Sequence, residues 1–94
     1  MPYVLFQISV EDYDKWKAAF DEYGPVRKGA GSKGGLVLRN ADDPTHVTIL
    51  LEWDSLDNGR NFTASAGLRE TMKQAGVIGP PNLYFLNEVD KPSV

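Results

Sequence analysis

The 94-residue chain contains no cysteine and a single histidine, His46. A disulfide, a thiolate metal site and a cysteine nucleophile are therefore excluded. The absence of cysteine suits a reducing compartment, so we expect a cytoplasmic protein. No cluster of histidine and carboxylate residues has the spacing of metal ligands, and neither a metal nor another cofactor is predicted.

Long apolar runs and basic stripes are also absent. The longest apolar runs fall far short of the ~20 residues that a membrane-spanning helix needs, and the first residues lack the basic start of a signal peptide. The 10 basic and 13 acidic residues are mixed along the chain, which argues against nucleic acid as a partner. The length predicts one domain, residues 1–94, with a flexible tail at 90–94.

The residues that are present predict four strands, at 3–10, 34–40, 46–53 and 82–89. In the first strand one face is wholly apolar and carries Val4, Phe6, Ile8 and Val10, while the other face is about half apolar. The third strand repeats this pattern, with Val47, Ile49, Leu51 and Trp53 on its apolar face. Strands with one wholly apolar face and one partly apolar face are expected to be covered on both sides.

Helical spacing separates these strands. Asp12 is a good N-cap before a helix whose apolar side carries Trp16 and Phe20. Gly24-Pro25 predicts a kink or a second short helix that reaches about residue 30 and stops at Gly31. Ser55 and Ser65 are the predicted caps of the later helical segments. The segment 79–81, Gly-Pro-Pro, is expected to be a rigid connector before the last strand.

The resulting order, βαββαβ, predicts a ferredoxin-like α+β fold: a four-stranded antiparallel sheet with helices on one face. The helices would cover the apolar faces of the first and third strands. Leu5, Leu50 and their neighbours would then remain on an uncovered face, and a patch of this kind usually marks an interface. We therefore expect a homodimer in which two sheets pack face to face in a dimeric α+β barrel.

Several segments carry a resemblance to a known family: Glu52-Trp53-Asp54-Ser55 at the end of the third strand, Ser65-Ala66-Gly67-Leu68-Arg69, and Pro-Asn-Leu-Tyr-Phe-Leu in the last strand. Residues 10–16 and 39–44 add to it. The chain resembles the dimeric α+β barrel superfamily, and within it small bacterial proteins of the antibiotic biosynthesis monooxygenase-like group. The resemblance covers nearly the whole chain. It implies the fold more strongly than the activity, because this superfamily holds several unrelated activities.

The resemblance also implies candidate chemistry. Some members of the group oxidise aromatic compounds without metal or flavin: a substrate anion reacts with oxygen in a pocket between sheet and helices, and Trp53 matches a tryptophan that assists there. Haem-degrading relatives use an amide on the first strand and a helix histidine. Here Gln7 is the only amide on that strand, Phe62 stands where many members have a histidine, and His46 lies beside a turn. Haem binding is therefore not expected.

The candidate site residues are few. Trp16, Trp53, Phe62 and Tyr84 are the candidates for contacting a small aromatic ligand. Trp53 and Arg39 are the candidates for catalysis, Arg39 through charge-assisted hydrogen bonds to a substrate anion. Each has a simpler interpretation, since aromatic side chains bury large areas wherever they lie, and Arg39 would pair with a carboxylate at the strand edge or the dimer interface.

Two functions remain open at this point. The first is a cofactor-independent monooxygenase or cyclase-like enzyme acting on a small aromatic or polyketide-like compound. The second is a non-catalytic ligand-binding or accessory dimer that uses the same pocket. In a third, purely structural case the pocket would be too full for a ligand, because ligand sites typically measure roughly 300 Å³ or more. The sequence does not fix the substrate, the use of oxygen or the role of His46.

Overall fold

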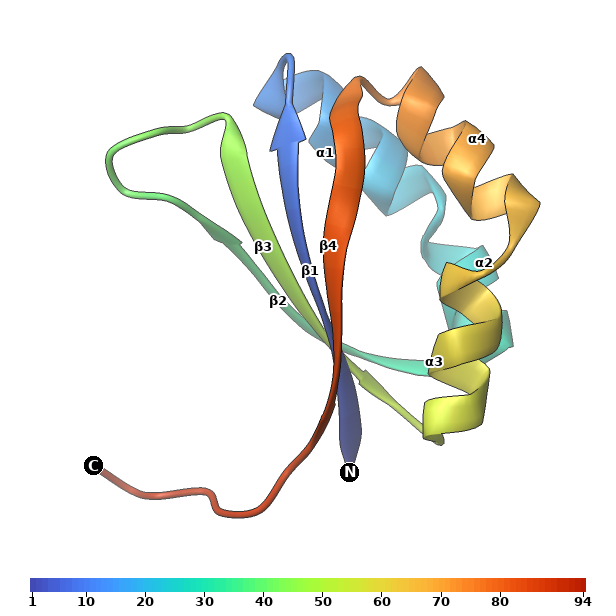
Figure 1. Cartoon of the computed structure of the whole chain (residues 1–94), viewed down its shortest axis with the longest axis vertical. Coiled ribbons are helices and arrows are strands. Elements are labelled where there is room, and N and C mark those ends of the chain that lie inside the picture. Colours follow the sequence, from blue (N-terminus) through green and yellow to red (C-terminus); the bar gives the residue numbers. More distant parts are fainter.

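Four helices pack on one face of a four-stranded antiparallel sheet, and the other face is uncovered (Figure 1). The computed structural model describes residues 1–94. The elements in chain order are β1 (Pro2–Val10), α1 (Tyr13–Glu22), α2 (Gly24–Ala30), β2 (Ser32–Arg39), β3 (His46–Trp53), α3 (Leu56–Thr63), α4 (Ala66–Gln74) and β4 (Val77–Asn87). The predicted α+β fold is confirmed, with each crossover made of two helices instead of one.

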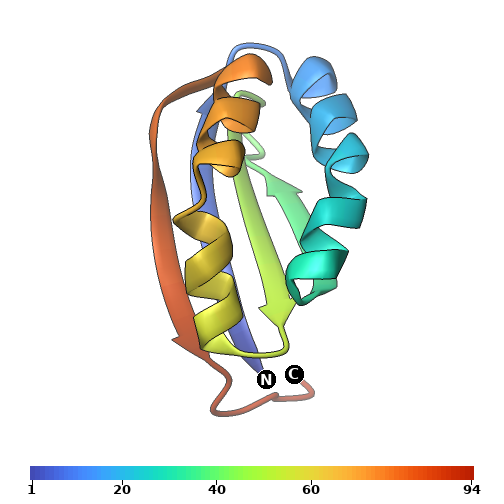
Figure 2. The same ribbon diagram turned by 90° about the vertical axis from the view of Figure 1, so that its right-hand side faces the viewer.

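The order of strands across the sheet is β2-β3-β1-β4, so the two strands with an apolar face on each side lie at the centre. All neighbours are antiparallel, and Leu5 of β1 lies opposite Leu50 of β3 and Tyr84 of β4. The two crossovers form two columns in front of the sheet: α1 and α2 run along one side, and α3 and α4 along the other (Figure 2). The core lies between these columns and the sheet.

Local capping chemistry fixes where the helices begin and end. The predicted N-caps all accept a backbone N–H two or three residues later: Asp12 at 3.0 Å, Ser55 at 3.1 Å and Ser65 at 3.2 Å. Gly31 ends α2 with a φ of 116°, a conformation that residues with a Cβ rarely adopt. The interruption at Gly24-Pro25 therefore starts a second short helix, with Pro25 in its first turn.

The core consists of twelve buried apolar residues that come from the predicted faces of β1 and β3 and from the inner sides of the helices. They are Val4, Phe6, Ile8, Val10, Trp16, Val47, Ile49, Leu51, Trp53, Phe62, Leu68 and Ala75. Full burial of one such large side chain contributes about 1.5–3 kcal/mol relative to exposure. The alternation read from the sequence therefore accounts for which face of the sheet the helices cover.

The last strand differs from the prediction, because β4 begins at Val77 and not at residue 82. Gly79, Pro80 and Pro81 lie inside the strand, at the irregularity where Gln7 pairs with Asn82 while Ser9 pairs with Ile78. Prolines are tolerated there because β4 is an edge strand, whose outer N–H groups have no partner in the sheet. The strand ends at Asn87, and residues 88–94 form no helix or strand.

Candidate functional site

A small apolar cavity lies between the sheet and the two columns of helices. Its volume is about 60 Å³, and 12 of its 14 lining residues are hydrophobic. They come from β1 and β3 (Phe6, Ile8, Ile49, Leu51), from α1 and α2 (Trp16, Ala19, Phe20, Tyr23, Arg27) and from α3 and α4 (Phe62, Leu68, Thr71, Met72, Ala75). The cavity is larger than the ~30 Å³ share of one water molecule and much smaller than the ~300 Å³ of a typical ligand site.

A wider groove adjoins the cavity on the side of β4. It measures about 690 Å³, runs between α4 and β4, and has Arg69 and Lys73 among its lining residues. Phe6, Leu68 and Met72 line both spaces and so form the wall between them. Met72 is only partly buried. Methionine has three rotatable bonds, and such a side chain adapts its shape more readily than a branched or aromatic one.

Arg27 is the only charged side chain that lines the cavity. Its guanidinium lies over the ring of Phe20, with Cζ 3.6 Å from the ring centroid, and its Nη1 donates a 2.6 Å hydrogen bond to the carbonyl oxygen of Phe20. Burial lowers the pKa of the Arg27 guanidinium, and the nearby Asp21 acts in the opposite direction. No carboxylate lies within ion-pair distance of Arg27, since the ion pairs of the structure are Lys17–Asp21 and His46–Asp43.

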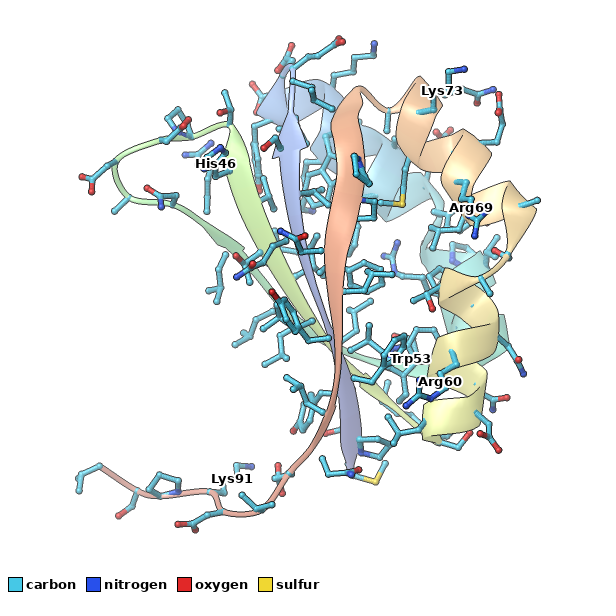
Figure 3. The ribbon with its side chains drawn as sticks, viewed as in Figure 1. His46, Trp53, Arg60, Arg69, Lys73 and Lys91 are labelled. Carbon is cyan, nitrogen blue, oxygen red and sulfur yellow. The ribbon has the colours of Figure 1, made fainter.

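Trp16 and Phe62, two of the predicted ligand contacts, line the cavity. Trp53 does not. It is fully buried on the helix side of the sheet near α3 (Figure 3), and its ring centroid lies 5.2 Å from that of Phe62. The indole Nε1 of Trp53 is a buried polar atom without a hydrogen-bond partner. Trp53 therefore supports a wall of the cavity from behind.

Tyr84 and Arg39 lie apart from this cavity. Tyr84 is 49% exposed on the uncovered face, because the alternation of β4 turns its neighbours Leu83 and Phe85 toward the helices. Arg39 is exposed at the end of β2, where its guanidinium lies 4.5 Å from the ring centroid of Tyr13. The predicted walls Trp53, Phe62 and Tyr84 thus do not share one pocket within the chain. Within the chain, Arg39 stacks on the ring of Tyr13, and its pairing with a carboxylate at a dimer interface stays a prediction.

His46 stands at the start of β3, at the end of the sheet remote from Trp53 (Figure 3). Its Nε2 lies 3.7 Å from Oδ2 of Asp43, and both side chains are about half exposed. Hydrogen bonds from the hydroxyl and the backbone N–H of Thr45, with a smaller contribution from His46, lower the pKa of Asp43. These contacts order the turn between β2 and β3. Neither here nor elsewhere in the chain is a group of three or more His, Asp or Glu side chains arranged to hold a metal ion.

Arg27 is a charged cavity residue that the sequence pattern did not single out. It lies in a seven-residue helix after a Gly-Pro break, where apolar spacing is too short to indicate an inner side. Its neighbours are an apolar residue, Val26, and a basic residue, Lys28, and both are exposed in the structure. Local composition therefore gives no sign that Arg27 turns inward. The contact between Arg27 and Phe20 becomes visible only when α2 is placed against the last turn of α1, where Phe20 lies.

The fold and this site define a class: a small α+β protein with an apolar cavity between sheet and helices. Several solved structures have the same fold. The structure matches a protein assigned as an antibiotic biosynthesis monooxygenase from Bordetella bronchiseptica, with a TM-score of 0.79, 22% identity and coverage of 94% of this chain and 96% of that one. It also matches SnoaB, a cofactor-independent oxygenase from Streptomyces nogalater, with a TM-score of 0.78, 12% identity and coverage of 99% and 97%.

A third match, to a protein from Nitrosomonas europaea with the same assignment, has a TM-score of 0.71, 17% identity and coverage of 96% and 100%. These structures show that the chain shares its fold with proteins assigned as antibiotic biosynthesis monooxygenases, which is the fold that the resemblance in the sequence implied. No protein-family model and no curated protein sequence matches the chain. No helix of the structure is both long and apolar enough to cross a membrane.

Proposed function

We propose that the chain binds a small electron-rich aromatic compound between its sheet and helices and promotes the reaction of that compound with oxygen. The observation that carries this proposal is the apolar cavity with a single cation in its wall. An apolar space screens charges less than water does, and this strengthens the interaction of Arg27 with an anion. SnoaB, which shares the fold, is described as a cofactor-independent oxygenase, and this supports the reaction type.

The chemistry requires little of the protein. When a phenol is deprotonated, the aromatic anion supplies the electrons that reduce oxygen. For 1-naphthol the balance is one naphthol and one O₂ giving one 1,4-naphthoquinone and one water: a C–O bond forms at the ring carbon opposite the hydroxyl, and the O–O bond breaks. The proposed contributions of the protein are to hold the ring between Trp16 and Phe62 and to stabilise the anion with Arg27.

The cavity as it stands is too small for a naphthol, so the proposal includes its enlargement. Rotation of Met72 would join the cavity of about 60 Å³ to the groove of about 690 Å³. The combined space would exceed the roughly 300 Å³ of typical ligand sites. Entry from the groove also passes Arg69 and Lys73, whose positive charges favour the approach of an anion.

The test is oxygen consumption and quinone formation from 1-naphthol by purified protein, with Ala19→Leu and Ala18→Leu as a matched pair. Ala19 lines the cavity and Ala18 is exposed on the same helix. Both substitutions introduce a good helix former, but only Ala19→Leu adds three carbon atoms to the cavity. The proposal expects turnover that Ala18→Leu retains and Ala19→Leu abolishes. Equal rates in both variants, or no reaction in wild type, would contradict it.

The composition of the cavity lining also supports a second function, ligand binding without catalysis. Its only hydroxyls are those of Tyr23 and Thr71, and it contains no carboxylate or histidine that could accept the phenol proton. We therefore keep a non-catalytic ligand-binding protein as the alternative. In that case ligand would raise the melting temperature of wild type and of Ala18→Leu without oxygen consumption.

We also propose that the working form is a homodimer that buries the uncovered face of the sheet. Leu36, Leu38 and Ile78 are each 50–55% exposed on that face, and Tyr84 and Leu86 extend the patch across β4. Leu5 and Leu50 at its centre are only partly covered. A second copy presenting the same apolar patch would cover these side chains, with the two sheets about 10 Å apart.

A further inference from the structure

We infer that Arg27 makes the cavity selective for an aromatic ligand that carries one planar oxyanion, such as a carboxylate or a phenolate. The inference rests on the proposed function, because it identifies the ligand class of the same cavity. It assigns the anion-recognising role to Arg27 on α2, whereas the sequence had indicated Arg39. A neutral aromatic of the same shape should bind much more weakly.

Arg27 is the one charged residue in the cavity lining, and its side chain is held in a fixed position. The other thirteen lining residues carry no charge, so Arg27 is the only residue of the lining that can pair with an ionic ligand. The side chain is held in place by two contacts with one residue: stacking on the ring of Phe20 and a hydrogen bond to the carbonyl oxygen of Phe20. A guanidinium that is already ordered loses little side-chain entropy when it binds an anion.

Arg27 also has unused hydrogen-bonding capacity. A guanidinium has five N–H donors, and the one hydrogen bond of the Arg27 side chain goes to Phe20. No carboxylate of the chain forms an ion pair with it: the ion pairs are formed by Lys17 with Asp21 and by His46 with Asp43. A half-buried cation without an ion-pair partner interacts more strongly with a ligand anion than an exposed one does, because water screens it less. A carboxylate matches the fork of donors in geometry as well as in charge, whereas a phenolate oxygen matches it in charge.

A purely structural role for Arg27 is the competing explanation. Arginine near a helix end often binds the last free carbonyls, and Phe20 lies in the last turn of α1. That role alone would make Arg27 important for stability, but it would not give the cavity any preference between charged and neutral ligands. The decisive measurement is therefore a ratio of affinities and not the stability of a variant.

The probes are benzoate and benzamide, which have nearly the same shape and differ in charge, with dissociation constants measured by calorimetry. We expect wild type to bind benzoate at least 10-fold more tightly than benzamide. Arg27→Met should bring this ratio close to one, and Arg27→Lys should leave an intermediate ratio, because it keeps the charge but loses the planar fork. Arg60→Met is the matched control. Arg60 also stacks on an aromatic ring, that of Phe85 at 4.4 Å, but does not line the cavity.

Each outcome decides the question. A ratio near one in wild type, or a preference for benzoate that survives in Arg27→Met, overturns the role of Arg27 while leaving a ligand-binding cavity. Absence of binding by both probes overturns this inference together with the proposed function. If Arg27→Met does not fold, the Nε–H resonance of Arg27 in wild type gives the answer. It should shift with benzoate and stay in place with benzamide, and the same shift with both would contradict the assignment.

Discussion

The rings of Trp53 and Phe62 pack against each other with their centroids 5.2 Å apart, and of the two only Phe62 reaches the cavity. Trp53 is completely buried behind it, with an indole N–H that has no hydrogen-bond partner. This places the tryptophan implied by the family resemblance in a supporting position. Its proposed role is to orient Phe62, and the ring of Phe62 is the surface that a ligand would contact.

The first prediction compares these two residues. Trp53→Phe should lower the free energy of unfolding by about 1–2 kcal/mol, because the packing lost with the smaller ring is partly offset by removal of the buried unpaired N–H. It should also leave benzoate affinity within about threefold of wild type. Phe62→Ala should weaken benzoate binding at least 10-fold, since it removes a wall. Denaturation in urea and calorimetry measure both quantities. A loss of affinity in Trp53→Phe as large as in Phe62→Ala would mean that Trp53 contacts the ligand.

The second prediction concerns how closely α3 approaches the sheet. A Cβ at Gly59 would lie 2.9 Å from Cγ2 of Val4 and 3.5 Å from the indole of Trp53. Gly59→Ala should therefore destabilise the protein by about 1–3 kcal/mol, although alanine is the better helix former. Gly67→Ala in α4 is the control, since its Cβ would meet only the Tyr23 hydroxyl at an ordinary 3.6 Å. Thermal unfolding of both variants is the measurement, and equal melting temperatures would contradict this close packing.

The fold could be predicted from the sequence because its determinants are local. The alternation in β1 and β3, the caps Asp12, Ser55 and Ser65, and the break at Gly24-Pro25 each act within a few residues. The start of β4 was not predictable in the same way. Gly79-Pro80-Pro81 is typical of a connector, and only the edge position of β4 allows these residues to continue the strand.

The site was less predictable than the fold, because it depends on which residues from different elements meet. Trp16 and Phe62 lie on apolar helix sides, and periodicity alone therefore places them toward the cavity. Tyr84 belongs to a strand with aromatic residues on both faces, so its side chain could be assigned to the cavity only with the sheet register. Arg27 enters the cavity wall through a contact between two helices, which no sequence pattern in α2 reveals.

The third prediction concerns Tyr3, which lies on the uncovered face with its hydroxyl 3.0 Å from Glu88 and 3.1 Å from Glu52. These hydrogen bonds, Glu88 first, raise the pKa of Tyr3 from 10.0 to about 12. The folded protein thus holds this proton more tightly than the unfolded chain. The stabilisation is complete below pH 10 and is lost as the pH rises through about 12.

An absorbance titration of the phenolates measures this pKa, and Tyr3→Phe identifies the transition by removing it. Glu88→Gln should bring the pKa of Tyr3 back toward 10.0, and Glu52→Gln should have the smaller effect. If neither substitution moved the transition, the two carboxylates could not be the cause of the raised pKa.

The fourth prediction tests the proposed dimer with two single substitutions, Leu36→Lys and Val26→Lys, which lie on opposite sides of the molecule. Leu36 is 55% exposed on the uncovered face of the sheet, and Val26 is 49% exposed on α2. In a symmetric dimer Leu36→Lys places a charge in the interface from both subunits, where it loses hydration without gaining a partner. Sedimentation equilibrium should show a wild-type dimer with a micromolar or lower dissociation constant, which Leu36→Lys raises at least 10-fold and Val26→Lys leaves unchanged.

A wild-type protein that sediments as a monomer at micromolar concentration would contradict the dimer. Equal weakening by both variants would mean that the interface lies on another surface. The first result would leave the cavity and Arg27 untouched, because every residue that lines the cavity belongs to one chain.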